Sequence, residues 1–277
     1  MIHRISFALF CLLITGGLKA QVNPMVRDWS DVDFMDTALI SSEAFRSRMV
    51  NDLYMNTAAD DMEQFDSLSM VSIATLMEKS KVNMRVYEYV LEFLLNGFTN
   101  MGRTQVVDYL LNYPMLFGGD ISEEEGLRLD SITEPYQLVK VGAEAPDVVG
   151  VTIDGKAYHL NESQAKMTLV VFWSTDCEYC HDFLVEIRKH LNLNTDFELV
   201  TFALADDQEE VAKTLKKMRL PGYHFYDNLR WEGKAFLDYH ITSTPTVFVL
   251  DEGKTIVCKP YDWNELKYWL RTNNISY

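Results

Sequence analysis

Positive charge is scarce in this sequence, which has 25 lysine and arginine residues against 41 aspartate and glutamate residues, a formal net charge of −16. An acidic surface repels phosphate groups, so we expect neither nucleic acid nor an anionic lipid surface among the partners. After the first twenty residues the sequence also lacks an apolar run of the roughly 20 residues that a membrane-spanning helix needs. We therefore expect no transmembrane segment in the mature chain.

The first twenty residues have the three regions of a secretory signal peptide. Residues 1–4 carry positive charge, residues 5–18 are apolar or small, and Ala20 is a small residue suited to the cleavage site. A membrane anchor is the alternative, but this apolar run is too short to span a bilayer comfortably. Cys11 follows Phe10, where a lipoprotein signal needs a small residue, so we do not expect lipidation. We predict cleavage after about Ala20, a mature charge of −18, and a periplasmic or cell-envelope location.

Cysteine is scarce as well, and one of the four cysteines, Cys11, leaves with the signal peptide. Exported proteins that use disulfides as structural staples usually carry an even number of cysteines. Here a close pair, Cys177 and Cys180, stands apart from the single Cys258, which suits a working pair and a buried apolar residue. A structural zinc site needs four ligands, and no second close pair is present. We expect neither a metal nor a cofactor.

Residues 21–138 are predicted to form an all-helical domain, because apolar residues recur at helical spacing. The expected helices cover about residues 41–54, 60–79, 86–98 and 105–113. A polar stretch, residues 118–134, leads to a domain boundary near residue 138. No cluster in this half has metal-ligand spacing or a nucleophile beside a base, so we interpret it as a packing or recognition module.

Residues 139–277 show a different pattern, in which strands alternate with helices. An Asp154-Gly155 turn between two short apolar segments predicts a β-hairpin. Nearly continuous apolar runs predict strands covered on both faces at residues 167–173 and 197–204. The further strands are expected at 223–226, 246–250 and 255–258, and the helices at 179–191, 208–218, 231–239 and 263–271. This order predicts an α/β fold, a mixed central sheet flanked by helices.

The pair Cys177 and Cys180 comes directly after the first of these buried strands, where a short loop enters a helix. Unpaired backbone N–H groups at a helix N-terminus stabilise an anion, so we expect the thiolate of Cys177 to be favoured. Two intervening residues let the second sulfur reach the first across one helical turn. The arrangement suits disulfide exchange, in which Cys177 attacks a partner disulfide and Cys180 resolves the mixed disulfide.

Residues 170–180 (VVFWSTDCEYC) resemble the active-site segment of thioredoxins, and residues 243–251 (STPTVFVLD) resemble the second hallmark of that family. The domain is most similar to exported thiol–disulfide proteins of the TlpA/ResA type. The helical half resembles, less specifically, an uncharacterised domain that precedes thioredoxin domains in envelope proteins of Bacteroidetes-type bacteria. The resemblance implies that Pro245 follows a cis peptide bond beside the cysteine pair, and that the backbone of Thr244 pairs with an incoming substrate strand.

Two departures from thioredoxin bear on the redox chemistry. Val171 stands where thioredoxin has a buried aspartate, so proton transfer to Cys180 must use another group or water. Asp176 stands where thioredoxin has a tryptophan, and a nearby carboxylate disfavours a thiolate. The reduction potential is therefore left open by the sequence.

The same residues admit other interpretations. Residues 177–181 (CEYCH) also spell a c-type haem attachment site, although a haem motif predicts neither the preceding strand nor the Thr244-Pro245 segment. A purely structural disulfide explains the pair but not its position between strand and helix. A peroxiredoxin needs proline and threonine where Val170 and Ser174 stand. His181 is expected to be an exposed residue of the first helical turn.

The sequence as a whole predicts an exported thiol–disulfide oxidoreductase with Cys177 and Cys180 as catalytic residues and Thr244 and Pro245 as substrate-binding residues. The TlpA/ResA resemblance implies a reductase of disulfide-bearing envelope proteins and a membrane electron donor that re-reduces it. The alternative from a different class is a non-catalytic binding module that uses the helical half as its docking surface.

Overall fold

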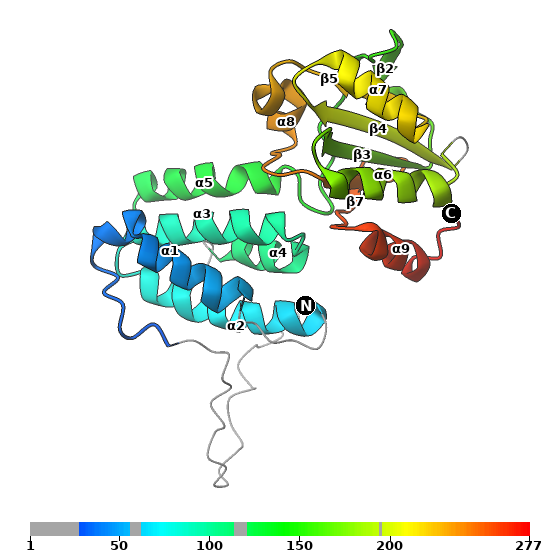
Figure 1. The fold of residues 1–277 in the computed structure, drawn as a ribbon. Coiled ribbons are helices and arrows are strands. Elements are labelled where there is room, and N and C mark those ends of the chain that lie inside the picture. Colours follow the sequence, from blue (N-terminus) through cyan, green and yellow to red (C-terminus); the bar gives the residue numbers. More distant parts are fainter. Residues whose placement is uncertain (1–27, 56–61, 114–120, 194–195) are drawn as a thin grey trace, which may run out of the picture.

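The computed structural model describes residues 28–55, 62–113, 121–193 and 196–277, which form a helical half and a half built on a β-sheet (Figure 1). The predicted signal peptide, residues 1–20, lies outside the described residues. Within the described part, no helix combines the length and apolar character needed to cross a membrane. The α/β class with a helical N-terminal half, as predicted from the sequence, is confirmed.

The helical half is a bundle around one central helix. Its elements are the short 3₁₀ helix Thr37–Ser41, α1 (Glu43–Met49) continued by a π-helical turn (Val50–Met55), α2 (Met62–Ser80), α3 (Met84–Asn100), α4 (Thr104–Asn112) and α5 (Glu123–Gln137). Helix α3 is central, because most of its apolar residues, among them Val90, Leu94 and Phe98, are fully buried between the other helices. Ser42 begins α1 by accepting the backbone N–H of Phe45 at 3.2 Å.

Helix α5 occupies much of the segment that the sequence identifies only as a polar stretch. Its start is fixed by a capping box, in which the Ser122 hydroxyl accepts the Glu125 N–H and the Glu125 carboxylate accepts the Ser122 N–H. The helix packs one narrow side, including Leu129 and Tyr136, onto the bundle and leaves the rest in water. An apolar stripe this narrow produces little helical periodicity in the sequence, so the spacing of apolar residues does not predict the helix.

The sheet half begins with the predicted hairpin, formed by β1 (Val149–Val151) and β2 (Ala157–His159). Gly155 takes the left-handed conformation (φ +83°) in the turn between them. The central sheet has the order β5-β4-β3-β6-β7. Its strands are β3 (Met167–Ser174), β4 (Phe197–Leu204), β5 (Tyr223–Tyr226), β6 (Thr246–Leu250) and β7 (Ile256–Cys258). Strands β3, β4 and β5 are parallel, whereas β6 and β7 pair antiparallel.

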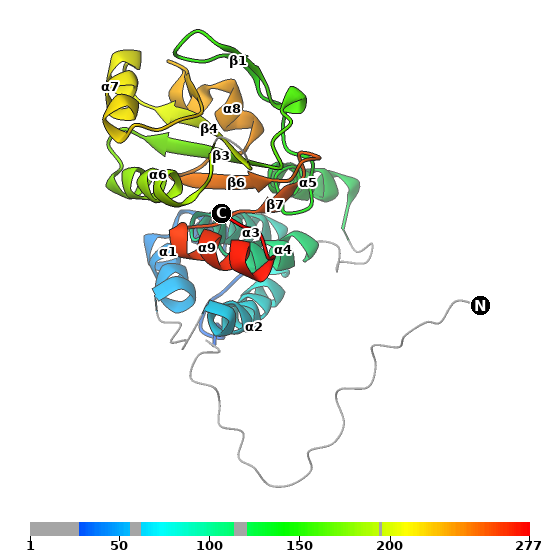
Figure 2. The ribbon, with the colours of Figure 1, turned by 90° about the vertical axis from the view of Figure 1, so that its right-hand side faces the viewer.

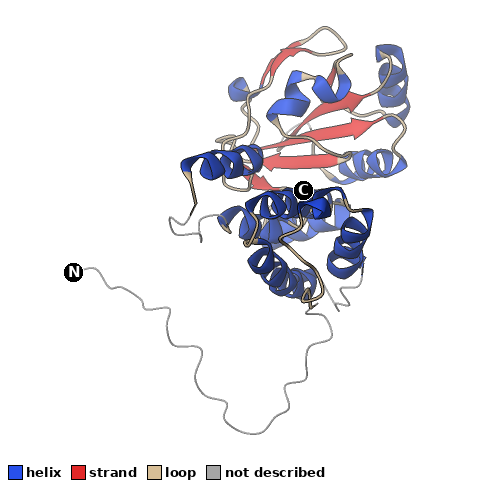
Figure 3. Cartoon of the chain, turned by 90° about the vertical axis from the view of Figure 1, so that its left-hand side faces the viewer, coloured by secondary structure: helices blue, strands red, loops and turns tan. Residues whose placement is uncertain are grey.

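Helices cover both faces of this sheet (Figure 3). On one face, α6 (Glu178–His190), α7 (Gln208–Met218) and α9 (Trp263–Thr272) pack against side chains such as Leu169 and Val171 of β3. On the other face, the short helix α8 (Lys234–Asp238) and the hairpin pack against Val170 and Phe172. Strand β3 is therefore buried on both sides, as its continuous apolar run predicts.

The two halves meet at the corner between α3 and α4, residues 100–103, which we call the α3–α4 corner. It lies against the start of α9 and the loop before β6 (Figure 2). Arg103 donates to both oxygens of Asp66 in α2, at 2.8 and 3.0 Å, and to Glu265 of α9 at 3.0 Å. Thr242 donates to the side-chain oxygen of Asn100 at 2.8 Å. Helix α5 ends at Gln137, and the domain boundary near residue 138 stays a prediction.

Candidate active site

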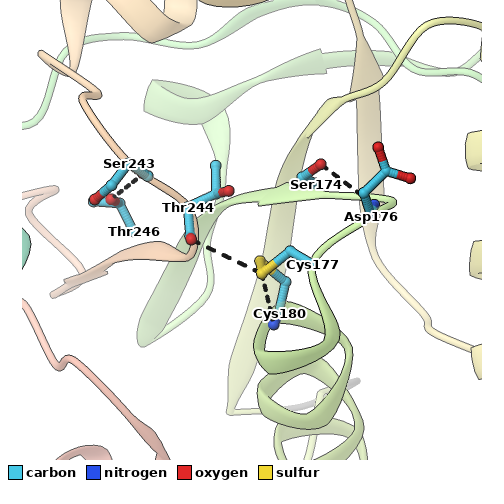
Figure 4. The surroundings of a disulfide bond; sticks show 7 residues. All are labelled: Ser174, Asp176, Cys177, Cys180, Ser243, Thr244 and Thr246. Carbon is cyan, nitrogen blue, oxygen red and sulfur yellow. Dashed lines mark hydrogen bonds between the residues drawn. A yellow bond between two sulfur atoms is a disulfide. The ribbon is translucent and has the colours of Figure 1, made fainter.

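The cysteine pair sits where β3 ends and α6 begins (Figure 4). Cys177 is the N-cap residue of α6, and its sulfur accepts the backbone N–H of Cys180 at 3.1 Å. The two sulfurs form a disulfide, with Cα atoms 5.2 Å apart. Cys177 is half-buried, whereas Cys180 is fully buried. A partner disulfide can therefore reach only the first sulfur, and the second can act only on a bond that the first has made.

The loop before β6 faces the disulfide from the other side. The Thr244–Pro245 peptide bond is cis, as the resemblance implies. The carbonyl oxygen of Thr244 lies 3.8 Å from the sulfur of Cys177. A disulfide sulfur carries no proton, so in the oxidised form the two atoms are only in contact. In the reduced form the Thr244 carbonyl oxygen can accept a hydrogen bond from the Cys177 thiol. The Thr246 hydroxyl donates to the Ser243 carbonyl at 2.7 Å and holds the loop in shape.

Behind the pair the surroundings are apolar. Val171 and Trp173 are fully buried and belong to the same core cluster as Cys180. Val171 therefore leaves no carboxylate at the place where thioredoxin has one. Asp176 is exposed, and its backbone N–H lies 3.4 Å from the Ser174 hydroxyl. The Asp176 carboxylate is thus in water, where screening weakens its unfavourable effect on a thiolate at Cys177.

His181 differs from the expectation. It is half-buried instead of exposed, and its Nε2 atom is buried without a hydrogen-bond partner among the described residues. The ring lies edge-on to Trp173, with centroids 5.9 Å apart. A c-type haem needs both cysteine sulfurs for thioether bonds and an accessible His181 ring as axial ligand. The buried Nε2 does not fit that role, and the described residues contain no group of three potential metal ligands.

The third cysteine has a different environment. Cys258 is a free cysteine on β7, half-buried against the core. Burial raises the pKa of its thiol to about 12. The thiol is therefore protonated at neutral pH and a poor nucleophile, in agreement with its interpretation as an apolar residue.

The predictions from the sequence miss the side chains that tie the helical half to this site. Asp66 is almost fully buried and is paired with Arg103, which reaches Glu265 162 positions further along the chain. The one available signal was polar residues inside an apolar helical stripe: Asp66, Ser69 and Ser72 of α2 are all buried. Cys177, Cys180, Thr244 and Pro245 are brought together as predicted, and their roles remain predictions.

Comparisons with known proteins agree with this geometry. Residues 164–256 match the family model described as thioredoxin-like. The thioredoxin-like protein YneN of Bacillus subtilis is 26% identical over 121 residues, which are 43% of this chain and 69% of that protein. The crystal structure of a thioredoxin-like protein from Bacteroides caccae aligns with a TM-score of 0.61 at 16% identity. That alignment covers 95% of this chain and 99% of the other, so the likeness in fold includes the helical half.

A thiol–disulfide oxidoreductase from Bacteroides fragilis aligns over 47% of this chain and 98% of its own, with 20% identity and a TM-score of 0.42. The family match begins before β3 and ends at the start of β7, so it includes both cysteines and the Thr244-Pro245 loop. The C-terminal part of this chain is a thioredoxin-like domain that carries a CxxC pair, preceded by a helical region.

Proposed function

We propose that the protein is an exported thiol–disulfide oxidoreductase that reduces disulfide bonds in proteins of the cell envelope. The observation that carries the proposal is the arrangement of the two sulfurs. Cys177 is half-exposed at the N-terminus of α6, and Cys180 lies buried directly behind it. A purely structural disulfide does not require one exposed and one buried sulfur. A nucleophilic cysteine has to be accessible, and a resolving cysteine can lie buried behind it.

The chemistry follows from that asymmetry. In the reduced protein, a thiolate at Cys177 is stabilised by the N–H of Cys180 and by the other unpaired N–H groups of the first turn of α6. It attacks one sulfur of a substrate disulfide, forms a mixed disulfide, and releases the other substrate sulfur as a thiolate that takes up a proton. Cys180 then gives up its proton and attacks the sulfur of Cys177. The second substrate sulfur leaves as a thiolate, takes up a proton, and the Cys177–Cys180 disulfide remains.

This cycle moves two electrons from the protein to the substrate, so a donor must restore the dithiol. The direction is proposed from the likeness to reducing proteins of the TlpA/ResA type, which also suggests a membrane electron donor. Export is proposed from residues 1–20, which have the charge and apolar pattern of a signal peptide. Thr244 is proposed to pair through its backbone with the substrate, because its carbonyl already faces Cys177.

The test is reduction of insulin disulfides by the pre-reduced protein lacking residues 1–20. We expect activity in the parent and a mixed disulfide that accumulates in Cys180→Ser, since that variant cannot resolve it. A parent protein that neither reduces nor oxidises protein disulfides would overturn the proposal. Retention of partner binding by such an inactive protein would favour the binding-module alternative.

A further inference from the structure

A groove lined by residues from both halves of the chain includes Thr244, whose carbonyl oxygen faces the sulfur of Cys177. One side is α6, with Tyr179 and Asp182, and the floor is the Ser243–Pro245 loop. The other side is the start of α9, residues 261–264, together with Asn100 at the end of α3. Its volume is about 580 Å³, which is enough for several side chains of an extended peptide.

The helical half is fixed in this position by a chain of polar contacts. Arg103 holds Glu265, whose other carboxylate oxygen accepts the backbone N–H of Tyr261 at 2.8 Å. The buried carboxylate of Asp66 holds the guanidinium of Arg103 from the opposite side. Gly102 (φ +66°) packs so closely on Tyr261 that an added Cβ would lie 2.6 Å from the Tyr261 Cβ. The position of the groove wall thus depends on the α3–α4 corner.

The groove is acidic and aromatic. Among the described residues, its lining includes three carboxylates, Asp182, Glu186 and Asp262, and no lysine, arginine or histidine. Glu186 forms an ion pair with Lys189 at 2.8 Å and lies 3.3 Å from His190, both on its own helix, so its charge is partly compensated. Asp262 caps α9 by accepting the N–H of Glu265 at 2.9 Å and forms no ion pair within the described residues. Asp182 forms no ion pair within the described part of the chain, so Asp182 and Asp262 carry most of the uncompensated charge.

Two aromatic rings extend into water at the same place. Tyr179, between the two cysteines, is 81% exposed, and Tyr261 is 56% exposed. Both residues line the groove, and rings this exposed contribute little to the core and are available to a partner. Aromatic faces flanked by carboxylates attract the guanidinium of arginine and the ammonium of lysine.

We propose that this groove binds an extended segment of the substrate protein that carries lysine or arginine close to its disulfide cysteine. The helical half forms part of the binding surface, directly through Asn100 and indirectly by holding residues 261–264. The inference rests on the proposed function and adds the substrate class to it. The charge of the groove attracts a basic segment and slows the approach of an acidic one.

The test uses two matched peptide disulfides, homodimers of a short peptide in which the cysteine is flanked by lysine in one and by glutamate in the other. The pre-reduced protein reacts with each peptide in a single turnover at low ionic strength. Each rate is divided by the rate with hydroxyethyl disulfide, an uncharged probe too small to fill the groove. We expect the lysine peptide to react roughly tenfold faster, with the preference shrinking as salt is added.

Two variants locate the preference in the groove. Asp182→Asn with Asp262→Asn removes both charges while asparagine keeps the cap of α9, and it should bring the two normalised rates close together. Asn100→Lys places a cation on the helical wall and should slow the lysine peptide relative to the glutamate peptide. Asn112→Lys adds the same charge at the C-terminal end of α4, away from the groove. It should leave the ratio of the two normalised rates as in the parent.

The outcomes separate the two proposals. No reaction with hydroxyethyl disulfide or with either peptide contradicts the proposed function itself. Reaction with hydroxyethyl disulfide and equal rates for the two peptides overturns the substrate class alone. A lysine preference that Asn100→Lys leaves unchanged contradicts the role of the helical half.

Discussion

The helical half and the sheet half bury different kinds of side chain next to the candidate site. The helical half buries a charged pair, Asp66 and Arg103, deep in its contact with the sheet half. The sheet half surrounds its buried cysteine, Cys180, with apolar side chains and leaves the other cysteine of the pair, Cys177, partly exposed to water. Under the proposals made above, the sheet half supplies the reacting sulfurs, and the helical half fixes part of the groove wall.

The largest effect should come from the reactive sulfur. Cys177→Ala removes the nucleophile, and we expect insulin reduction to fall about 10³-fold or more. Cys258→Ala is the matched control, because burial raises the pKa of that thiol to about 12 and keeps it protonated. It should reduce insulin at nearly the parent rate. Comparable losses in the two variants would contradict the assignment of the chemistry to Cys177.

The next effect lies in the helical half. Arg103→Ala leaves the carboxylate of Asp66 buried without its partner, and such a loss typically costs about 3 kcal/mol or more of unfolding free energy. Lys213→Ala removes an exposed pair with Glu209 and should cost less than about 1 kcal/mol. Urea unfolding measures both variants. Equal costs would show that the buried pair is not what holds the α3–α4 corner.

A smaller effect is expected from close packing at that corner. Gly102→Ala combines a left-handed conformation with a clash against Tyr261, whereas Gly142→Ala has the same conformational strain (φ +91°) and open space around it. The strain alone costs about 1 kcal/mol, and overpacking adds about 1–3 kcal/mol. The difference between the two variants in urea unfolding isolates the contact between the halves. Gly102→Ala should lower the unfolding free energy more than Gly142→Ala does. Equal losses would mean that the α3–α4 corner can shift and relieve the contact with Tyr261.

The smallest effect is one of pH. Burial lowers the pKa of Lys259 to about 8, and its ammonium lies over the ring of Phe248 at 4.9 Å. A base with a lowered folded pKa binds fewer protons when folded, so stability should rise with pH between about 8 and its ordinary value of 10.5. The side chain is half-exposed, so we expect a slope well below the about 1.4 kcal/mol per pH unit of one full proton.

Lys259→Met supplies the control for that slope, because Cys258 and several tyrosines also titrate above pH 9. The parent should gain more stability than the variant between pH 8 and 10 in urea unfolding. Parallel curves would mean that Lys259 keeps an ordinary pKa in the folded protein.

Most of the sheet half could be predicted from the sequence, since buried strands such as β3 are continuous apolar runs and the turn at Gly155 needs a glycine. The cysteine pair and the Thr244-Pro245 loop are predictable because each lies in a local segment that resembles one family. Helix α5 was missed because its apolar side is narrow and its strongest signal is the Ser122–Glu125 capping box.

The groove could not be predicted, because its walls are far apart in the chain. Asn100 and Tyr261 meet only after both halves have folded, and neither belongs to a motif. His181 was expected to be exposed because it lies in a first helical turn, but its ring packs against Trp173. Local sequence patterns determine strands, helices and caps, whereas contacts between distant side chains depend on the tertiary structure.

The reduction potential of the Cys177–Cys180 couple tests the proposed function most directly. The parent protein is equilibrated with thiol–disulfide buffers of defined potential, and alkylation of the free thiols then measures the reduced fraction at each potential. A reductase predicts a value near that of thioredoxin, about −270 mV. A value near about −120 mV, typical of a strong oxidant, would contradict the proposed direction of electron flow.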